Sequence, residues 1–145
     1  FTTIDLIEKD KDKFGDTDYI LYLHTKGASK QNVPNYDKIV SWRHVMNYWK
    51  IEKSNFALDR LKNTNYNTYG VLLCDINNCV FYSGNFWWAK ASYLKTLNME
   101  NISKNRNNAE WGFIQNGDEW KPYSPYNLGH TNYYYTKFER EEYAK

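Results

Sequence analysis

Tyr19-Ile20-Leu21-Tyr22-Leu23-His24-Thr25-Lys26-Gly27 gives the clearest indication of fold class in this chain. Its first five residues form a continuous apolar run of strand length, without polar alternation. Strands of this kind are typical of α/β proteins, in which both faces of the sheet are covered. The run ends abruptly at His24, where a polar loop begins. We therefore expect a buried strand whose carboxyl end presents the tetrapeptide His24–Gly27.

Outward from this strand, the spacing of apolar residues predicts helices on both sides. Thr3–Phe14 carries helix-forming residues with one small apolar cluster, which predicts a short helix. Apolar residues three and four apart predict helix from Asp37 to about Asn63, divided at Ser54-Asn55, with one of these two residues capping the second helix. Helical spacing returns over Phe86–Leu97, and a further short helix is expected over Ala109–Gln115.

A second buried strand is expected at Tyr69–Cys74. Asp75–Asn78 has turn chemistry, and Cys79–Tyr82 is then expected to return as a hairpin partner. Ser83-Gly84-Asn85 ends that strand. The order strand, helices, strand, helix is that of an α/β layer protein. We therefore expect one domain over residues 1–145, in which helices flank the sheet.

The composition excludes several classes of protein. A chain of 145 residues has the length of one ordinary domain, and an aromatic content of 19% argues against disorder. A net charge of +2 gives no support for a nucleic-acid partner. No apolar run approaches the ~20 residues needed to cross a bilayer. The two cysteines cannot form a disulfide scaffold, so we expect a cytoplasmic protein.

His24-Thr25-Lys26-Gly27 is the first candidate site. In open α/β sheets, ligands bind in the crevice outside the carboxyl ends of the strands. Lys26 at that position suits a phosphate or diphosphate as a point positive charge, and Gly27 lets the backbone approach closely. A plain turn with a solvated lysine explains the same residues, and on composition alone it is the stronger interpretation.

The second candidate is the segment Tyr82–Lys90, which combines small, amide and aromatic side chains at a strand end. Sugars are held by this mixture, because aromatic faces cover C–H surfaces while Asn and Ser bind hydroxyls. The alternative is that Phe86, Trp87 and Trp88 belong to the core, and we expect this of at least one of them.

Arg106 and Glu110 stand four residues apart near an expected helix start. Glu110 lies beside Trp111, and a carboxylate in apolar surroundings is suited to accept a proton near neutral pH. The alternative is an Arg–Glu pair on the surface, which contributes little. On spacing alone, the surface pair is the stronger interpretation.

Metal-ligand patterns are sparse in this sequence. The three histidines lack the spacing of zinc ligands. Asp16 and Asp18 precede their strand, whereas a nucleotide-metal motif follows one. Asp75 and Asn77 follow a strand and are therefore the better-placed candidates for a divalent ion, although a second carboxylate is missing.

Taken together, the motifs resemble a group of glycosyltransferase-like proteins found in bacterial surface-polysaccharide loci and large DNA viruses. The resemblance covers the chain from about Tyr19 to Trp111, and its longest strings are HTKG and SGNFWWAK. The segments that carry it are, in order, Leu21–Gly27, Trp42-Arg43, Tyr48-Trp49, Ser83–Lys90, Arg106 and Glu110-Trp111.

This resemblance implies a GT-A fold, which is a Rossmann-like mixed sheet flanked by helices. The chain begins just before the central strand of that fold, so part of the N-terminal nucleotide-binding half is expected to be missing. The chain is then either a truncated product or a reduced version with an incomplete donor site. An exposed sheet edge in such a protein favours self-association or a partner chain.

The resemblance also implies roles for the candidate residues. Lys26 would neutralise the diphosphate of a nucleotide-sugar donor, with or without Mn²⁺ or Mg²⁺, and Glu110 would be the general base. The acceptor would be a glycan or a lipid-linked saccharide. The other donor-side residues would be His24, Thr25, Gly27 and Arg43. The residues on the side of the sugar and the acceptor would be Ser83, Gly84, Asn85, Trp87, Trp88 and Arg106.

Two other functions stay open on the sequence. A non-catalytic carbohydrate-binding module, or an inactive fragment of such an enzyme, suits the tyrosine and tryptophan content and needs no nucleotide. A single-stranded nucleic-acid binder would use aromatic stacking, but the chain lacks a basic run.

Overall fold

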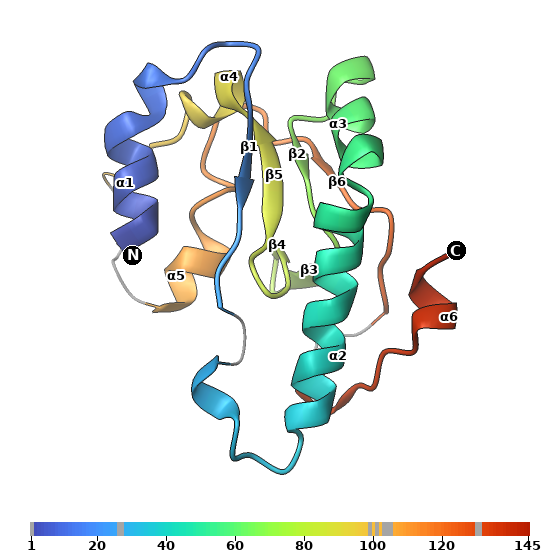
Figure 1. Ribbon diagram of the computed structural model, residues 1–145. Coiled ribbons are helices and arrows are strands. Elements are labelled where there is room, and N and C mark those ends of the chain that lie inside the picture. The colour runs from blue at the N-terminus through green and yellow to red at the C-terminus, as the bar shows by residue number, and fades with distance from the viewer. Residues whose placement is uncertain (1, 26–27, 99, 101, 103–105, 130–131) are drawn as a thin grey trace.

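The computed structural model describes residues 2–25, 28–98, 100, 102, 106–129 and 132–145, with the backbone alone at positions 2, 28, 106 and 107. Within these residues the chain has a mixed α/β architecture in which helices flank a mixed sheet (Figure 1). A separate two-stranded hairpin packs beside this sheet. The predicted combination of a mixed sheet with flanking helices is thus confirmed.

The main sheet has four strands in the order β1-β5-β2-β6. Their bounds are Tyr19–Tyr22, Trp87–Lys90, Thr68–Tyr69 and Pro122–Tyr123 respectively. β5 is antiparallel to both of its neighbours, and β2 is parallel to β6. The carboxyl ends of β1, β2 and β6 and the amino end of β5 therefore lie at the same edge of the sheet.

Helices cover both faces of this sheet (Figure 1). On one face lie α2 (Tyr36–Asn47), a π-helical segment η3 (Tyr48–Glu52) and α3 (Ser54–Asn63). On the other lie α1 (Thr2–Asp10) and α5 (Arg106–Trp111). The remaining elements are η1 (Lys11–Lys13), η2 (Ala28–Lys30), α4 (Ala91–Leu94), η4 (Tyr133–Tyr135), α6 (Arg140–Tyr143), and the hairpin strands β3 (Leu73–Ile76) and β4 (Cys79–Tyr82).

Strand alternation in β5 divides the core between the two faces. Trp87 is fully buried on the α1 face, where it joins a cluster with Ile4 and Phe113. Trp88 is half-buried on the α3 face and packs against the cluster that contains Leu61 and Tyr69. Neighbouring tryptophans thus anchor opposite layers of the protein.

Several sequence predictions agree with the structure. A short helix forms at the N-terminal end, as expected for Thr3–Phe14. The long helical stretch is divided at Ser54, where α3 begins after the π-helical segment. The hairpin also forms, and Asn77 and Asn78 adopt the positive φ angles, 52° and 64°, that a tight two-residue turn requires.

The first strand does not lie where it was expected. β1 is at the edge of the described sheet and pairs with β5 alone, so it is not the central strand. Its residues are half-buried from Tyr19 to Leu21, and only Tyr22 is buried. A continuous apolar run indicates that both faces of a strand are covered, but it does not indicate whether the strand pairs with one neighbour or with two.

The prediction of one strand over Tyr69–Cys74 is wrong, because the chain leaves the main sheet at Gly70. A Cβ placed on Gly70 would lie 2.2 Å from the Tyr82 ring, and Leu72 adopts a positive φ of 54°. These two positions separate β2 from β3, which belongs to the hairpin. The backbone turns here because the aromatic ring packs directly against it.

Three helix predictions also need correction. Trp87–Lys90 forms strand β5 and not the start of a helix, because pairing with both β1 and β2 overrides the apparent helical spacing. Neither Ser54 nor Asn55 caps α3, which follows Lys53 without a side-chain cap. The short helix expected at Ala109–Gln115 ends at Trp111 and begins earlier than expected.

Candidate functional site

The two long motifs meet at one edge of the sheet because β1 and β5 are paired. Their register places Tyr22 opposite Trp87, so the residues after β1 run beside the turn that precedes β5. His24 Nε2 donates a hydrogen bond to the Gly84 carbonyl oxygen at 2.8 Å. The imidazole also packs edge-on against Phe86, with ring centroids 4.8 Å apart. His24 and Gly84 are thereby in direct contact, although they are 60 residues apart in the sequence.

The amide of Gly84 is held from a third element. Its N–H donates to Glu110 Oε1 at 2.6 Å, so α5 places its carboxylate against the turn. Charge-assisted hydrogen bonds of this kind are short and directional. Both polar groups of the Gly84 backbone are thus bound by side chains, one from the end of β1 and one from α5.

Glycine is required at position 84 by both conformation and space. Its φ of 90° is one that other residues rarely adopt. A Cβ here would lie 2.4 Å from Met46 Sδ and 3.4 Å from Trp42 Cζ2, both on α2. The turn is therefore wedged between α2, the end of β1 and α5.

Asn85 secures α5 to the same turn. It is buried, with a φ of 55°, and its Nδ2 donates to the Ala109 carbonyl oxygen at 2.9 Å. Its Oδ1 accepts the indole N–H of Trp87 at 3.1 Å. Because Ala109 precedes Glu110, this amide fixes the backbone that carries the candidate base.

The two tryptophans expected to contact a sugar point to opposite faces of the sheet. Trp87 is fully buried and stacks on Tyr22, with centroids 4.9 Å apart, so its ring offers no surface to a ligand. Trp88 lies on the opposite face of the sheet and donates its indole N–H to the Lys50 carbonyl oxygen. Trp87 is thus a core residue, as the sequence predicted for at least one of the three aromatic residues in this segment. It contacts the turn through its hydrogen bond to Asn85.

The remaining sugar-side and donor-side candidates differ in exposure. Ser83 is buried, and its N–H donates to the Leu72 carbonyl oxygen. Thr25 is exposed beyond His24. Arg43 is half-buried on α2, one helical turn before Met46 and on the same side of that helix.

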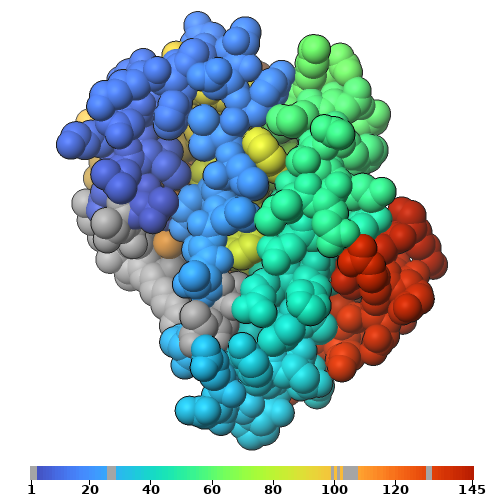
Figure 2. Space-filling view, in the orientation of Figure 1, coloured from blue at the N-terminus to red at the C-terminus, as the bar shows by residue number. Residues whose placement is uncertain are grey.

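Three further predicted positions are not fully described. Lys26 and Gly27 lie outside the described residues. Arg106 begins α5, four residues before Glu110, but its side chain is likewise outside the described part of the chain. In Figure 2 yellow atoms remain visible between the blue segment that contains β1 and the teal helix α2.

The candidate metal residues do not converge. Asp75 lies inside β3 rather than after it, and Asn77 lies in the exposed turn of the hairpin. No group of three or more His, Cys, Asp or Glu side chains comes together in the described part of the chain. This donor set does not fit a divalent ion, which needs several convergent oxygen ligands.

Met46 and Cys74 are neighbours of the turn that were not predicted from the sequence. Cys74 is buried beneath it, with its Sγ 3.5 Å from the Tyr133 hydroxyl. Burial raises the pKa of the Cys74 thiol, and the charge of Glu110 adds to this effect. The buried Cys74 side chain packs in the core beside the turn. The helical spacing of Trp42 and Met46 was the available signal for their shared face, but it did not identify Gly84 as their contact.

Comparisons with known proteins return no match: no protein-family model, no curated protein and no solved structure is significantly similar to this chain. Among the described residues, no helix is long and apolar enough to span a membrane.

Proposed function

We propose that this chain is a glycosyltransferase of GT-A type that moves a sugar from a nucleotide-diphospho-sugar donor to a hydroxyl of a glycan or lipid-linked saccharide. The observation that carries the proposal is the convergence of three motifs on Gly84. His24 comes from the HTKG string, Gly84 from the SGNFWWAK string, and Glu110 from the third motif. These segments are far apart in sequence, and they are the ones on which the resemblance rests.

Glu110 is the general base in this proposal. Its carboxylate is held in position by the Gly84 N–H. Glu110 takes the proton of the acceptor hydroxyl as that oxygen attacks the anomeric carbon. The bond from this carbon to the donor diphosphate breaks, and the nucleoside diphosphate leaves with the electron pair.

The donor diphosphate is assigned to the residues that follow β1. Lys26 and Arg43 supply positive charge that stabilises the developing charge of the leaving group. His24 and Thr25 line the same loop, and His24 fixes the loop to the Gly84 turn. No step is assigned to a metal ion, because Asp75 and Asn77 do not form a suitable ligand set.

The test is a transfer assay with a panel of nucleotide sugars, comparing Glu110→Gln with the parent chain. Glutamine keeps an oxygen that can accept the Gly84 N–H but cannot take a proton, so the rate is expected to fall by at least ~10²-fold. Glu141→Gln, a change at an exposed carboxylate on α6, is the matched control and is expected to leave the rate unchanged. Binding of the donor is followed separately, as the rise in melting temperature that the nucleotide sugar causes. Lys26→Ala is expected to reduce this rise, because Lys26 is assigned to the donor diphosphate.

Two results would count against the proposal. Transfer that survives in Glu110→Gln would remove Glu110 from the role of base. Stabilisation by glycans but by none of the nucleotides would assign the chain to the alternative function, a carbohydrate-binding module. Circular dichroism of each variant is needed to show that the fold is retained.

A further inference from the structure

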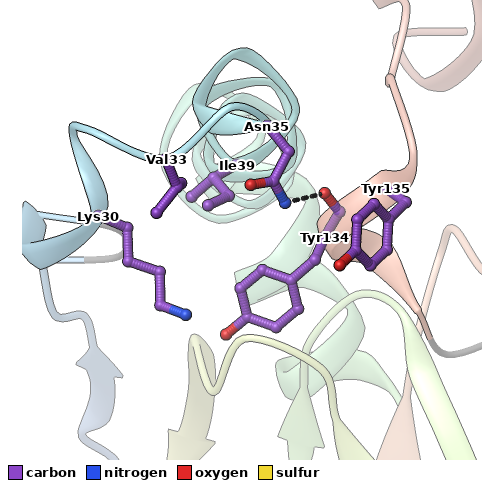
Figure 3. Close-up of a pocket in the computed structure, with 6 residues that line it drawn as sticks. All are labelled: Lys30, Val33, Asn35, Ile39, Tyr134 and Tyr135. Carbon is purple, nitrogen blue, oxygen red and sulfur yellow. Dashed lines mark hydrogen bonds between the residues drawn. The ribbon is translucent and has the colours of Figure 1, made fainter.

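A hollow lies away from the turn at Gly84, between η2, the start of α2 and η4. Its volume is about 250 Å³, and six residues line it: Lys30, Val33, Asn35, Ile39, Tyr134 and Tyr135 (Figure 3). None of these residues belongs to the motifs discussed above. We refer to this hollow as the Tyr134 cavity.

The Tyr134 cavity has a positive charge and no opposing carboxylate in its lining. Lys30 Nζ lies 4.7 Å from the centroid of the Tyr134 ring. In the described part of the chain, Lys30 forms no ion pair with an acidic residue. An ammonium group in this setting is available to an anionic group of a ligand.

The other lining groups suit a sugar ring. Asn35 Nδ2 donates to the Tyr134 carbonyl oxygen at 2.6 Å, which fixes the amide so that its Oδ1 points away from that carbonyl (Figure 3). A fixed amide oxygen accepts hydrogen bonds from hydroxyl groups. Val33, Ile39 and the Tyr134 ring supply apolar surface, and Tyr135 is 69% exposed at the rim. The lining thus combines apolar contact, one fixed acceptor and one cation.

The Trp42 side chain lies between the Tyr134 cavity and the candidate active site. The Trp42 indole packs edge-on against Tyr134, with centroids 5.4 Å apart. The same indole lies 3.4 Å from the position that a Cβ on Gly84 would take. Trp42 therefore separates the Tyr134 cavity from the turn that holds His24 and Glu110.

We propose that the Tyr134 cavity binds one acidic sugar ring of the acceptor saccharide, and this rests on the proposed transferase function. The volume is just below the ~300–1,000 Å³ of typical small-molecule sites, so it suits one sugar ring and not a nucleotide sugar. The Tyr134 side chain covers one face of the sugar ring, and Asn35 Oδ1 accepts a hydrogen bond from a sugar hydroxyl. Lys30 binds the carboxylate or phosphate substituent.

The experiment follows binding alone, by two-dimensional amide NMR of the labelled chain without donor. Glucuronic acid and glucose 6-phosphate are titrated as the two kinds of acidic sugar, with glucose and inorganic phosphate as the separate parts. Shifts are expected at Asn35, Tyr134 and Tyr135. At least one acidic sugar is expected to bind about tenfold more tightly than glucose, as one charge-assisted hydrogen bond predicts.

Lys30→Met tests the cation while keeping most of the side chain. It is expected to remove the preference for the acidic sugar. Lys53→Met is the matched control, because Lys53 also lies over a tyrosine ring, that of Tyr48, but on another part of the molecule. The Lys53 variant is expected to bind like the parent chain.

Three results would overturn this proposal: equal binding of glucose and both acidic sugars, binding of inorganic phosphate as tight as that of glucose 6-phosphate, or an unchanged preference in Lys30→Met. The assay uses neither donor nor transfer. If transfer is lost in Glu110→Gln but no sugar binds at the Tyr134 cavity, only the proposal for this cavity is overturned. Sugar binding with no transfer by the parent chain would overturn the proposed transferase instead.

Discussion

Two turns of this chain place consecutive residues in the left-handed region, and they are built in different ways. Asn77 and Asn78 form the exposed turn between β3 and β4, where the flanking strands pair with each other. Gly84 and Asn85 have similarly positive φ angles, but they are also hydrogen-bonded to His24, Glu110 and Ala109, which are 24 to 60 positions away. The first turn is a local structure, whereas the second depends on three distant elements.

This difference indicates where the molecule is specialised. A hairpin turn needs only residues that tolerate positive φ, and asparagine does so readily. The Gly84 turn brings a histidine, a carboxylate and a thioether to one peptide group, although a local turn would have connected β4 to β5. We expect substitutions at the two turns to differ accordingly.

The largest effect is expected for Gly84→Ala. The new methyl group would clash with Met46 Sδ at 2.4 Å and hold alanine at a φ of 90°. Left-handed strain and overpacking each cost about 1–3 kcal/mol, so the free energy of unfolding should fall by about 2–6 kcal/mol. Urea denaturation followed by tryptophan fluorescence measures this change.

Asn78→Ala is the matched variant at the exposed turn. Alanine at a φ of 64° meets the same kind of strain without a buried clash, so the expected loss is about 1–2 kcal/mol. Equal losses at positions 84 and 78 would mean that the packing of Met46 adds nothing. The proposed distinction between the two turns would then have no energetic basis.

Lys50 differs from Gly84 in its hydrogen bonding, because its amine is fully buried with no hydrogen-bond partner among the described residues. Every polar backbone group of Gly84 is bound, whereas this polar atom is not. Lys50→Met keeps the shape and removes the amine, so the free energy of unfolding should rise by about 1–3 kcal/mol. The exposed neighbour Lys53, changed to Met, is the control and should have a smaller effect.

The same residue predicts a dependence on pH. Burial lowers the pKa of Lys50 well below its usual value of 10.5. At a pH between the pKa of Lys50 in the native chain and its pKa in the unfolded chain, the unfolded chain binds a proton that the native chain does not. Lys50 therefore makes the free energy of unfolding fall as the pH decreases through this range. Lys50→Met should reduce the difference in stability between pH 7 and pH 10. An unchanged difference would show that Lys50 stays charged in solution.

A smaller effect is expected for His24→Ala. The imidazole donates one hydrogen bond to Gly84, but it is exposed, so water replaces it. The expected loss is about 0.5–1.5 kcal/mol, below that of Gly84→Ala. Thermal unfolding measures it, with His44→Ala on the exposed side of α2 as the control. A loss as large as that at Gly84 would make His24 the main support of the turn.

Local patterns in the sequence predicted much of the fold. The division of the helices at Ser54 and the hairpin at Asn77-Asn78 follow from residue spacing and turn chemistry. The same reasoning failed at Trp87–Lys90, where two neighbouring strands impose an extended backbone on a segment with helical spacing. It also failed at Gly70, where a distant tyrosine ring decides the path of the chain.

The candidate site was predictable as a set of motifs but not as an arrangement. His24, Gly84 and Glu110 were each singled out from the sequence, and the structure brings them together. The inward direction of Trp87 and the contact with Met46 depend on strand register and helix packing. Neither can be obtained from residue types alone, because each requires the position of a second element.

The pairing of β1 with β5 links two properties that are usually separable. The same register that stacks Tyr22 on Trp87 in the core sets His24 beside Gly84. Because side chains alternate along a strand, the loss or gain of one residue in either strand would reverse its faces and separate the two motifs together. Substitutions can vary the site while the core stays intact, but changes of length in these strands cannot. We expect the length of this segment to be more constrained than its composition.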